Sequence, residues 1–205
     1  MNKQPKYKIC RRLGLAVFSK CENPKFSPAP KQKMRKSKSG GRSLSEYGNQ
    51  LLEKQRARFV YNLRERQFAK YVRESAQKKG GTPAGNLYRT LESRLDNVVF
   101  RLGLTKSRAA ARQMVSHGHI TVNGKKITVP SFEVGAGDTV RVREGSQGKA
   151  LFSALAEKLK EHTPPPWLVF DAEKKEGVVK AAPSLESATT REPLNLTALI
   201  EFYGR

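Results

Sequence analysis

The dipeptide Asn123-Gly124 constrains the fold of this chain more than any other short feature of the sequence. It separates two runs of strand-forming residues, 119–122 and 125–129, and it supplies two residue types that tolerate the positive φ angles of a type I′ turn. The sequence therefore predicts a tight β-hairpin at this position. A further strand is predicted at 139–142, after a cluster of glycine and aspartate turn residues.

Two helices are predicted immediately before the hairpin. Apolar residues follow helical spacing from Leu87 to Leu102, where Gly103 provides a stop. A shorter helical pattern runs from Lys106 to Val115 and ends before Gly118. Together with the strands, these helices predict a compact helix-helix-hairpin unit that spans residues 91–145.

The formal net charge of +22 is distributed unevenly along the chain. Residues 1–42 carry 13 lysines and arginines against one acidic residue, whereas residues 151–205 carry 7 against 8. Because this charge exceeds what solubility requires, we expect a polyanionic partner for the first three quarters of the chain. The alternative is a surface that is merely solvated. The nearly neutral last quarter is suited to protein contacts or to packing on the fold.

The rest of the chain divides into three predicted regions. Residues 1–42 combine lysines with prolines and glycines and show no sustained helical period, so we expect an extended basic arm. A helical domain follows over 43–90, with a capping box that starts at Ser43 and a second cap at Asn62. Residues 151–205 are expected to complete this domain by packing back on it and to face protein partners. The predicted fold class is α+β.

Basic and hydrogen-bonding side chains gather on one predicted face of the helix-helix-hairpin unit. Lysine and arginine supply contacts to phosphate, while serine, asparagine and backbone N–H groups supply neutral hydrogen bonds. The structural alternative is a pair of helices with a solvated basic side. The candidate binding residues in the unit are Arg94, Arg101, Lys106, Ser107, Arg108, Arg112, Gln113, His117, His119, Asn123, Lys125 and Lys126. The candidates in the helical domain are Arg56, Arg58, Arg64, Arg66 and Lys70.

Three segments of the unit resemble a known RNA-binding module. Arg94–Gly103, Ser107–Gly118 and Ile120–Gly124 are similar to the module named after small-subunit ribosomal protein four. That module also occurs in tyrosyl-tRNA synthetases, pseudouridine synthases and a ribosome-associated heat-shock protein. By itself, the resemblance therefore implies binding of structured RNA and no more.

The flanking sequence indicates which family carries the module. Arg42–Gly48, Leu52–Arg56, Glu65–Phe68 and Leu199–Tyr203 resemble the family of bacterial-type small-subunit ribosomal protein four, and the resemblance covers nearly the whole chain. It implies a non-catalytic constituent of the small ribosomal subunit that binds a junction in the 5′ domain of the subunit's RNA and nucleates assembly of the subunit body. It also implies contact with ribosomal protein five and a role in decoding accuracy with proteins five and twelve.

The resemblance further implies a position beside the channel through which mRNA enters. On this sequence, that role falls on Lys36, Lys38 and Arg42, in the segment before the capping box. The nearly neutral segment 151–205 is then the expected interface with protein five. Two other interpretations stay open: an RNA-modifying enzyme or assembly factor that carries the same module, and a nonspecific compactor of nucleic acids.

No metal ion, cofactor or catalytic site is expected. Many relatives hold zinc near the N-terminus with four cysteines, but here Cys10 and Cys21 are the only cysteines and are separated by ten residues. Neither His117 nor His119 lies near them in the sequence, and no catalytic Ser-His-Asp or Cys-His set emerges.

The expected compartment is the cytoplasm. The apolar stretch 13–18 is too short for a secretory signal, and no run approaches the length of a membrane span. The sequence does not distinguish a bacterial ribosome from an organellar one. No membrane partner and no homo-oligomer are expected.

Overall fold

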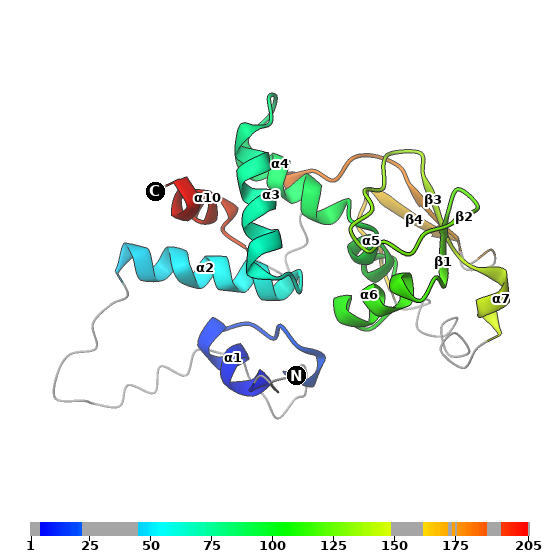
Figure 1. The fold of residues 1–205 in the computed structure, drawn as a ribbon, viewed down its shortest axis with the longest axis horizontal. Helices are drawn as coiled ribbons and strands as arrows, with labels where there is room; N and C mark the ends of the chain where they lie inside the picture. The colour runs from blue at the N-terminus through cyan, green and yellow to red at the C-terminus, as the bar shows by residue number, and fades with distance from the viewer. Residues whose placement is uncertain are drawn as a thin grey trace. The chain divides into compact units, whose positions relative to one another are not determined.

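A computed structural model of the chain divides into two compact units (Figure 1). Unit 1 comprises Met1–Lys70 and Leu194–Arg205, and unit 2 comprises Tyr71–Pro193. The residues that the structure describes are 5–21, 45–148, 162–171, 174, 176–187 and 194–204. The predicted contacts Lys36, Lys38 and Arg42 and the predicted cap Ser43 lie outside these ranges.

Unit 1 is helical. Its elements are α1 (Lys6–Leu13), the 3-10 turn η1 (Ser19–Cys21), α2 (Glu46–Val60), the first part of α3 (Glu65–Gln77), and α10 (Leu196–Gly204). Helix α10 packs against α2, so the end of the chain completes this unit.

Helix α2 differs from the prediction at both ends. It begins after Ser45, whose Oγ accepts a hydrogen bond from Gly48 N at 3.2 Å. It ends at Asn62, which has φ 51°, while the N–H groups of Asn62 and Leu63 donate to the carbonyls of Phe59 and Arg58. This is a Schellman motif, in which asparagine replaces the usual glycine. Asn62 therefore closes α2, whereas the sequence predicted that it opens α3.

The N-terminal segment contains a helix where an extended arm was predicted. Residues 6–13 form α1, which ends at Gly14 with φ 65°. Cys10 and Leu13 are buried on one side of it, and the buried Cys21 thiol contacts Lys6 O at 3.8 Å. This short helix packs through only these two buried side chains. Two positions are too few to appear as a sustained helical period in the sequence. Burial, together with a hydrogen bond to Cys10, raises the pKa of the Cys21 thiol to about 12.

A carboxylate joins three helices of unit 1. Glu65 Oε1 accepts hydrogen bonds from Lys54 Nζ and from Tyr203 OH, both at 2.8 Å. Lys54 Nζ also lies 4.7 Å from the ring centroid of Phe202. Burial alone would raise the pKa of Glu65, but the hydrogen bonds from Lys54 and Tyr203 outweigh it and lower that pKa. α10 is thus held at the α2–α3 corner by polar as well as apolar contacts.

Unit 2 combines short helices with one sheet. Its elements after the end of α3 are α4 (Pro83–Glu92), α5 (Leu95–Arg101), α6 (Arg108–Ser116), β1 (Ile120–Val122), β2 (Lys125–Lys126), β3 (Thr139–Val142), α7 (Glu144–Gln147), β4 (Leu168–Asp171), β5 (Glu176–Val179) and the 3-10 turn η2 (Leu185–Ser187). These elements give unit 2 the predicted α+β character.

The long helix predicted up to Leu102 is two helices, because the chain becomes extended at Arg94 (ψ 135°). The loop after the hairpin explains the break. Its carbonyl groups at Phe132 and Pro130 accept hydrogen bonds from Leu95 N (2.8 Å) and Asp96 N (3.1 Å), so they satisfy the first free donors of α5. Because the chain turns away to make these contacts, β2 is also shorter than the predicted strand 125–129.

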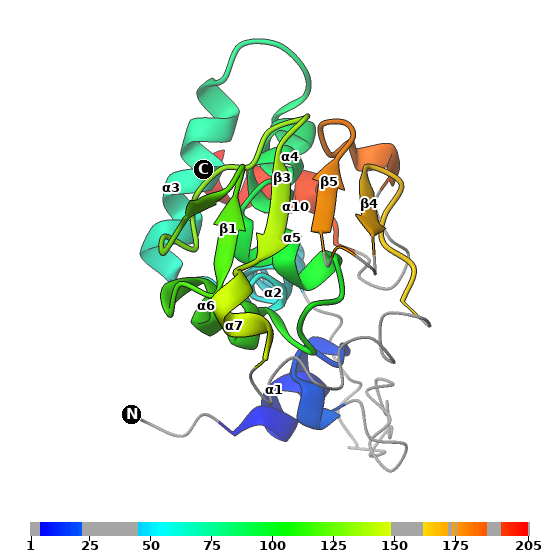
Figure 2. The same cartoon turned by 90° about the vertical axis from the view of Figure 1, so that its right-hand side faces the viewer.

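The sheet has the order β2-β1-β3-β5-β4 and is antiparallel throughout (Figure 2). The hairpin turn is as predicted, with φ 49° at Asn123 and 78° at Gly124. The prediction that all of 151–205 packs on the helical domain is corrected, because residues 168–179 add β5 and β4 to the free edge of β3. Unit 2 therefore extends well beyond residue 145.

One face of the sheet is covered by α5 and α6, which form the core of unit 2 with it. The core residues include Leu95, Val98, Leu102, Val115, Ile120, Val140, Val142, Trp167, Leu168 and Val179. The approach is closest at Gly177, where an added Cβ would lie 2.5 Å from Leu102 Cδ1. Glycine on β5 thus lets the buried Leu102 side chain pack directly on the backbone.

Replacement of Gly177 by alanine is expected to destabilise unit 2 by about 1–3 kcal/mol, because the added methyl group overpacks a core with little freedom to shift. The free energy of unfolding, measured by urea denaturation, checks this. The matched control is Gly145→Ala in α7, where nothing lies within 4 Å of an added Cβ and stability should hold or rise slightly. Equal stability of the two variants would contradict the packing argument.

Candidate nucleic-acid interface

The α5–α6 corner and the hairpin bring the predicted binding residues of unit 2 together. Helix α6 begins after Ser107, whose Oγ accepts a hydrogen bond from Ala110 N at 3.3 Å. It ends in a second Schellman motif, in which Gly118 has φ 70° and donates to Val115 O, while His119 N donates to Met114 O. Lys106 before the helix and His117 at its end are exposed.

Arg101 and Arg108 face inward, although both were predicted to lie on the basic face. Glu92, which is fully buried, accepts hydrogen bonds from Arg101 Nε (2.9 Å), Arg101 Nη2 (2.8 Å) and Asn97 Nδ2 (2.9 Å). The Asn97 amide oxygen accepts from Arg108 Nε at 2.8 Å. The Arg108 guanidinium also lies 4.4 Å from the ring centroid of Phe100. These contacts join α4, α5 and the start of α6.

A second carboxylate holds two more of the predicted arginines. Asp96 accepts hydrogen bonds from Arg94 Nε and Nη2 at 3.0 and 2.8 Å, and from Arg112 Nε and Nη2 at 3.0 and 2.9 Å. Arg94 also donates to the hydroxyl of Tyr71. The Asp96 and Arg94 side chains are each only 5% exposed, and Arg112 is 29% exposed. Asp96 therefore ties α6 to the start of α5.

Four of the predicted contacts take part in an internal network of ion pairs and hydrogen bonds: Arg94, Arg101, Arg108 and the partly exposed Arg112. Arginine suits this role because its planar guanidinium can bind a carboxylate through two parallel N–H groups. A buried charge is tolerated only when it is paired and hydrogen-bonded, which Glu92 and Asp96 provide. The positive charge that unit 2 shows to solvent comes mainly from other residues.

The exposed face of unit 2 is formed by lysines and neutral polar groups. Lys106, Gln113, His117, Asn123, Lys125 and Lys126 are exposed, as predicted, while Ser107 and His119 are half-buried. Asn123 is committed to the turn, because its Nδ2 donates to Asp138 Oδ1 at 2.8 Å and its Oδ1 accepts from Thr139 N at 2.9 Å. The His119 Nδ1 atom lies 2.9 Å from Ser146 Oγ.

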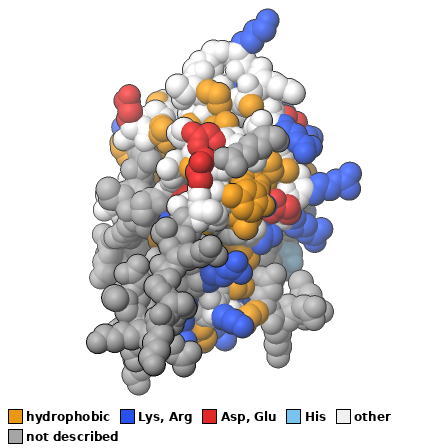
Figure 3. Space-filling model, turned by 90° about the vertical axis from the view of Figure 1, so that its left-hand side faces the viewer, with side chains coloured by type: hydrophobic (Ala, Val, Ile, Leu, Met, Phe, Trp, Pro, Cys, Tyr) orange, Lys and Arg blue, Asp and Glu red, His pale blue; other side chains and the backbone are white. Residues whose placement is uncertain are grey.

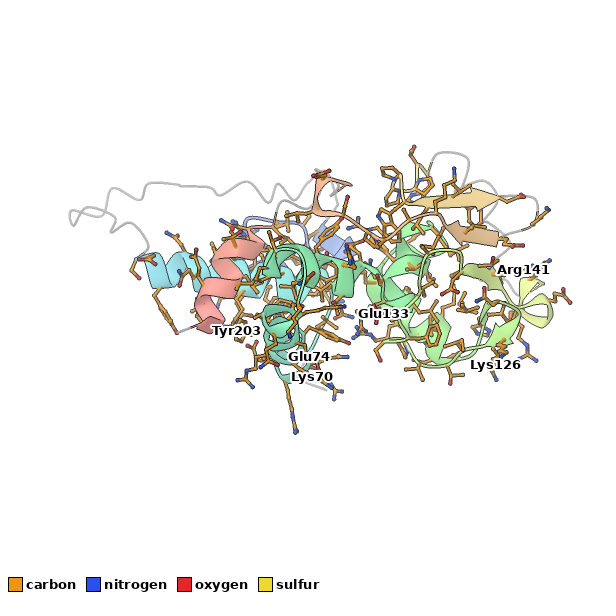
Figure 4. The ribbon with its side chains drawn as sticks, turned by 90° about the horizontal axis from the view of Figure 1, so that it is seen from above. Lys70, Glu74, Lys126, Glu133, Arg141 and Tyr203 are labelled. Atoms are coloured by element: carbon orange, nitrogen blue, oxygen red, sulfur yellow. The ribbon has the colours of Figure 1, made fainter. Side chains whose placement is uncertain are left out.

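Two arginines on this side of the sheet were not among the predicted contacts. Arg141 on β3 pairs with Thr121 on β1, which pairs with Lys126 on β2, so the three side chains share one row (Figure 4). Arg143 follows and is exposed. The alternation in Thr139–Val142, with both valines buried, could have revealed the outward position of Arg141.

The predicted contacts of unit 1 divide into internal and exposed residues. Arg56 donates to Leu13 O at 2.6 Å and pairs with Glu53. Arg58 donates to Gln55 Oε1 at 3.1 Å, and its guanidinium lies 4.4 Å from the Phe59 ring centroid.

Three other predicted contacts of unit 1, Arg64, Arg66 and Lys70, are exposed around the start of α3. On α1, the exposed Arg11 and Arg12 add basic side chains that were counted only as part of the arm. These side chains are exposed, so they can approach phosphates.

The described residues hold no group of three or more histidine, cysteine or acidic side chains that could bind a metal ion. Among the same residues, every helix is too short or too polar to span a bilayer. The chemistry that the exposed residues of both units can perform is ionic and hydrogen-bonded contact with a polyanion.

Replacement of Glu92 by glutamine should destabilise unit 2 by about 3–5 kcal/mol, because it leaves the buried Arg101 guanidinium without its counter-charge. Chemical denaturation followed by circular dichroism provides the measurement. Glu144→Gln serves as the control, since the Glu144 side chain is 83% exposed and its loss should change stability by less than about 0.5 kcal/mol. Similar effects of the two substitutions would show that the internal network contributes nothing.

Comparison with known proteins matches residues 1–140 to two described families. Residues 1–92 match the ribosomal protein S4/S9 N-terminal domain, and residues 93–140 match the S4 domain. A small ribosomal subunit protein uS4A from Alkaliphilus oremlandii is 46% identical over 97% of this chain and 96% of its own length. Small ribosomal subunit proteins uS4 from Desulforamulus reducens and Lachnospira eligens are 41% and 39% identical, covering 98% and 100% of this chain and 97% and 99% of their own lengths.

Proposed function

Since this chain belongs to the family of small ribosomal subunit protein uS4, we propose that it is a structural, non-catalytic constituent of the small ribosomal subunit that binds the subunit's RNA. The observation that carries the proposal is the similarity over the full length, 46% identity across 97% of the chain, which includes both units. The exposed lysines of the hairpin and the α5–α6 corner supply the matching chemistry.

The RNA target that we propose is a multi-helix junction in the 5′ domain of the small-subunit RNA, which the protein binds early to nucleate the subunit body. The bases of an A-form helix are hard to reach, so structured RNA is bound mainly through its shape, its phosphates and its 2′-hydroxyl groups. Lys106, Lys125, Lys126 and Arg141 supply charged contacts of this kind. Their distribution over the loop before α6 and the strands β2 and β3 suits a folded target. The internal arginines act indirectly by holding that surface in shape.

Binding to a transcript of the 5′ domain should be tight, salt-dependent and stronger than binding to random duplex RNA of equal length at moderate salt. Lys125→Ala should weaken binding and reduce the slope of log K against log salt concentration by about 0.9 if one phosphate contact is lost. Filter binding over a salt series measures both quantities. Lys180→Ala is the control, because Lys180 is exposed and follows β5, two positions from β1 in the sheet order.

Equal affinity for the 5′ domain and random duplex would favour a nonspecific compactor over the proposed function. The other alternative, an RNA-modifying enzyme or assembly factor, would be favoured if the protein modified the bound transcript or left the finished subunit. The small number of acidic residues in the described basic regions and their use in ion pairs speak against a catalytic site.

Contact with ribosomal protein five, and through it a link to protein twelve in decoding accuracy, forms the second part of the proposal. The support lies in the nearly neutral C-terminal segment and in the aromatic groups that α10 and α2 present. Tyr47 is 53% exposed, and its ring centroid lies 5.5 Å from that of the half-buried Phe202. Figure 3, which faces the side where α10 lies, shows apolar side chains at the surface among charged ones. Such a mixture suits a protein interface better than a phosphate backbone.

A position at the channel through which mRNA enters is the third part, and it assigns contacts to Lys36, Lys38 and Arg42. Replacement of all three by alanine should slow the unwinding of structured mRNA by reconstituted ribosomes, because three charges that can hold the mRNA backbone are lost. The control replaces Arg73, Lys78 and Lys79, three exposed basic residues elsewhere in the chain. Unwinding at the unaltered rate in the first variant would count against this assignment.

A further inference from the structure

Gly118 and Lys126 are packed against each other across the module. An added Cβ on Gly118 would lie 2.2 Å from Lys126 Cε, 3.0 Å from Nζ and 3.4 Å from Cδ. The last methylene groups of Lys126 therefore lie directly on the backbone of Gly118, at the point where α6 ends. Any side chain at position 118 would have to displace the lysine.

This contact is unusual for a lysine at the edge of a sheet. Lys126 belongs to the two-residue strand β2, the end strand of the sheet, and its side chain is exposed. An exposed lysine ordinarily samples many rotamers, and fixing it on a ligand costs side-chain entropy. In the structure, the Lys126 side chain lies over Gly118, in space that a side chain at position 118 would occupy.

The local field also favours this placement. The end of α6 carries the partial negative charge of the helix dipole, so an ammonium group is stabilised there. Arg141 belongs to the same cross-strand row as Lys126, and the exposed His117 is the C-cap residue of α6. A phosphate at this point would meet the Lys126 ammonium beside the end of α6.

From these contacts we propose that Gly118 is a positioning residue for RNA binding. Because glycine has no side chain, it leaves room for Lys126 to take the orientation in which the ammonium contacts one RNA phosphate. The inference rests on the RNA binding proposed above and deepens it. It assigns a binding role to a residue that carries no charge and that would otherwise be explained only by the φ of 70° at the helix end.

The test uses Gly118→Asn, because asparagine adopts positive φ in this same chain at Asn62 and Asn123. The substitution therefore keeps the backbone and displaces only the lysine. Affinity for the 5′-domain transcript should fall about threefold to tenfold, and the salt slope should fall by about 0.9, as for the loss of one phosphate contact. Lys126→Ala should give the same two changes.

The double variant Gly118→Asn with Lys126→Ala separates positioning from general damage. Because the clash disappears with the lysine, the double variant should be folded and should bind like Lys126→Ala alone. The matched control is Gly137→Asn, at φ 88° with nothing within 4 Å of an added Cβ, which should bind RNA like the unaltered chain. Thermal unfolding of all variants reports stability independently of binding.

Unchanged affinity of Gly118→Asn, or losses that multiply in the double variant, would overturn the inference. A drop in affinity of Gly137→Asn equal to that of Gly118→Asn would also overturn it, because backbone strain would then explain both. Failure of the unaltered chain to prefer the 5′-domain transcript is a different result, since it removes the proposed function before any variant is compared.

Discussion

The pairing of arginines with the two buried carboxylates, Glu92 and Asp96, is the interaction on which unit 2 depends. A chain with a net charge of +22 has to fold without gathering repelling cations in its interior. Glu92 and Asp96 solve this by accepting hydrogen bonds from three guanidinium groups, those of Arg94, Arg101 and Arg112. A fourth, that of Arg108, donates to Asn97, which itself donates to Glu92. The lysines, whose compact and strongly hydrated charges are costly to bury, are left outside. The exposed charge around the hairpin is thereby supplied mainly by lysines, together with Arg141 and Arg143.

Unit 1 follows the same principle with different residues. There the buried cation is Lys54, and Glu65 receives its ammonium together with the hydroxyl of Tyr203. Arg56 is used to hold the backbone after α1 through Leu13 O. In both units, acidic side chains lie where helices meet: Glu65 in unit 1, and Glu92 and Asp96 in unit 2. The RNA binding that we propose would use the exposed basic side chains, while these internal pairs hold the helices that carry them.

Local signals in the sequence were enough to predict several turns, although not the role of Asn62, and they did not predict the contacts between distant segments. Asn123-Gly124, Gly103 and Gly118 were predicted correctly because positive φ restricts the residue type at one position. The break at Arg94 was missed, since it depends on carbonyl groups from the loop near Phe132, far along the chain. The inward direction of the arginines was missed for the same reason. A sequence shows how many charged residues a chain has, but it does not show which residues pair with them. The pairing of β5 with β3 requires knowledge of which sheet edge is free.

The way in which β5 and α10 complete the two units has a consequence for how the protein forms. Strand β5 pairs with β3 across a long stretch of chain, and α10 packs on α2 across a longer one. Contacts between such distant residues raise the contact order and slow folding, because a large loop must close before they can form. During synthesis, α2 and β3 leave the ribosome well before α10 and β5. Until those partners are made, the apolar face of α2 and the edge of β3 are uncovered. A new chain of this protein is therefore most exposed to aggregation, or most in need of its RNA, in the interval before its last segment appears.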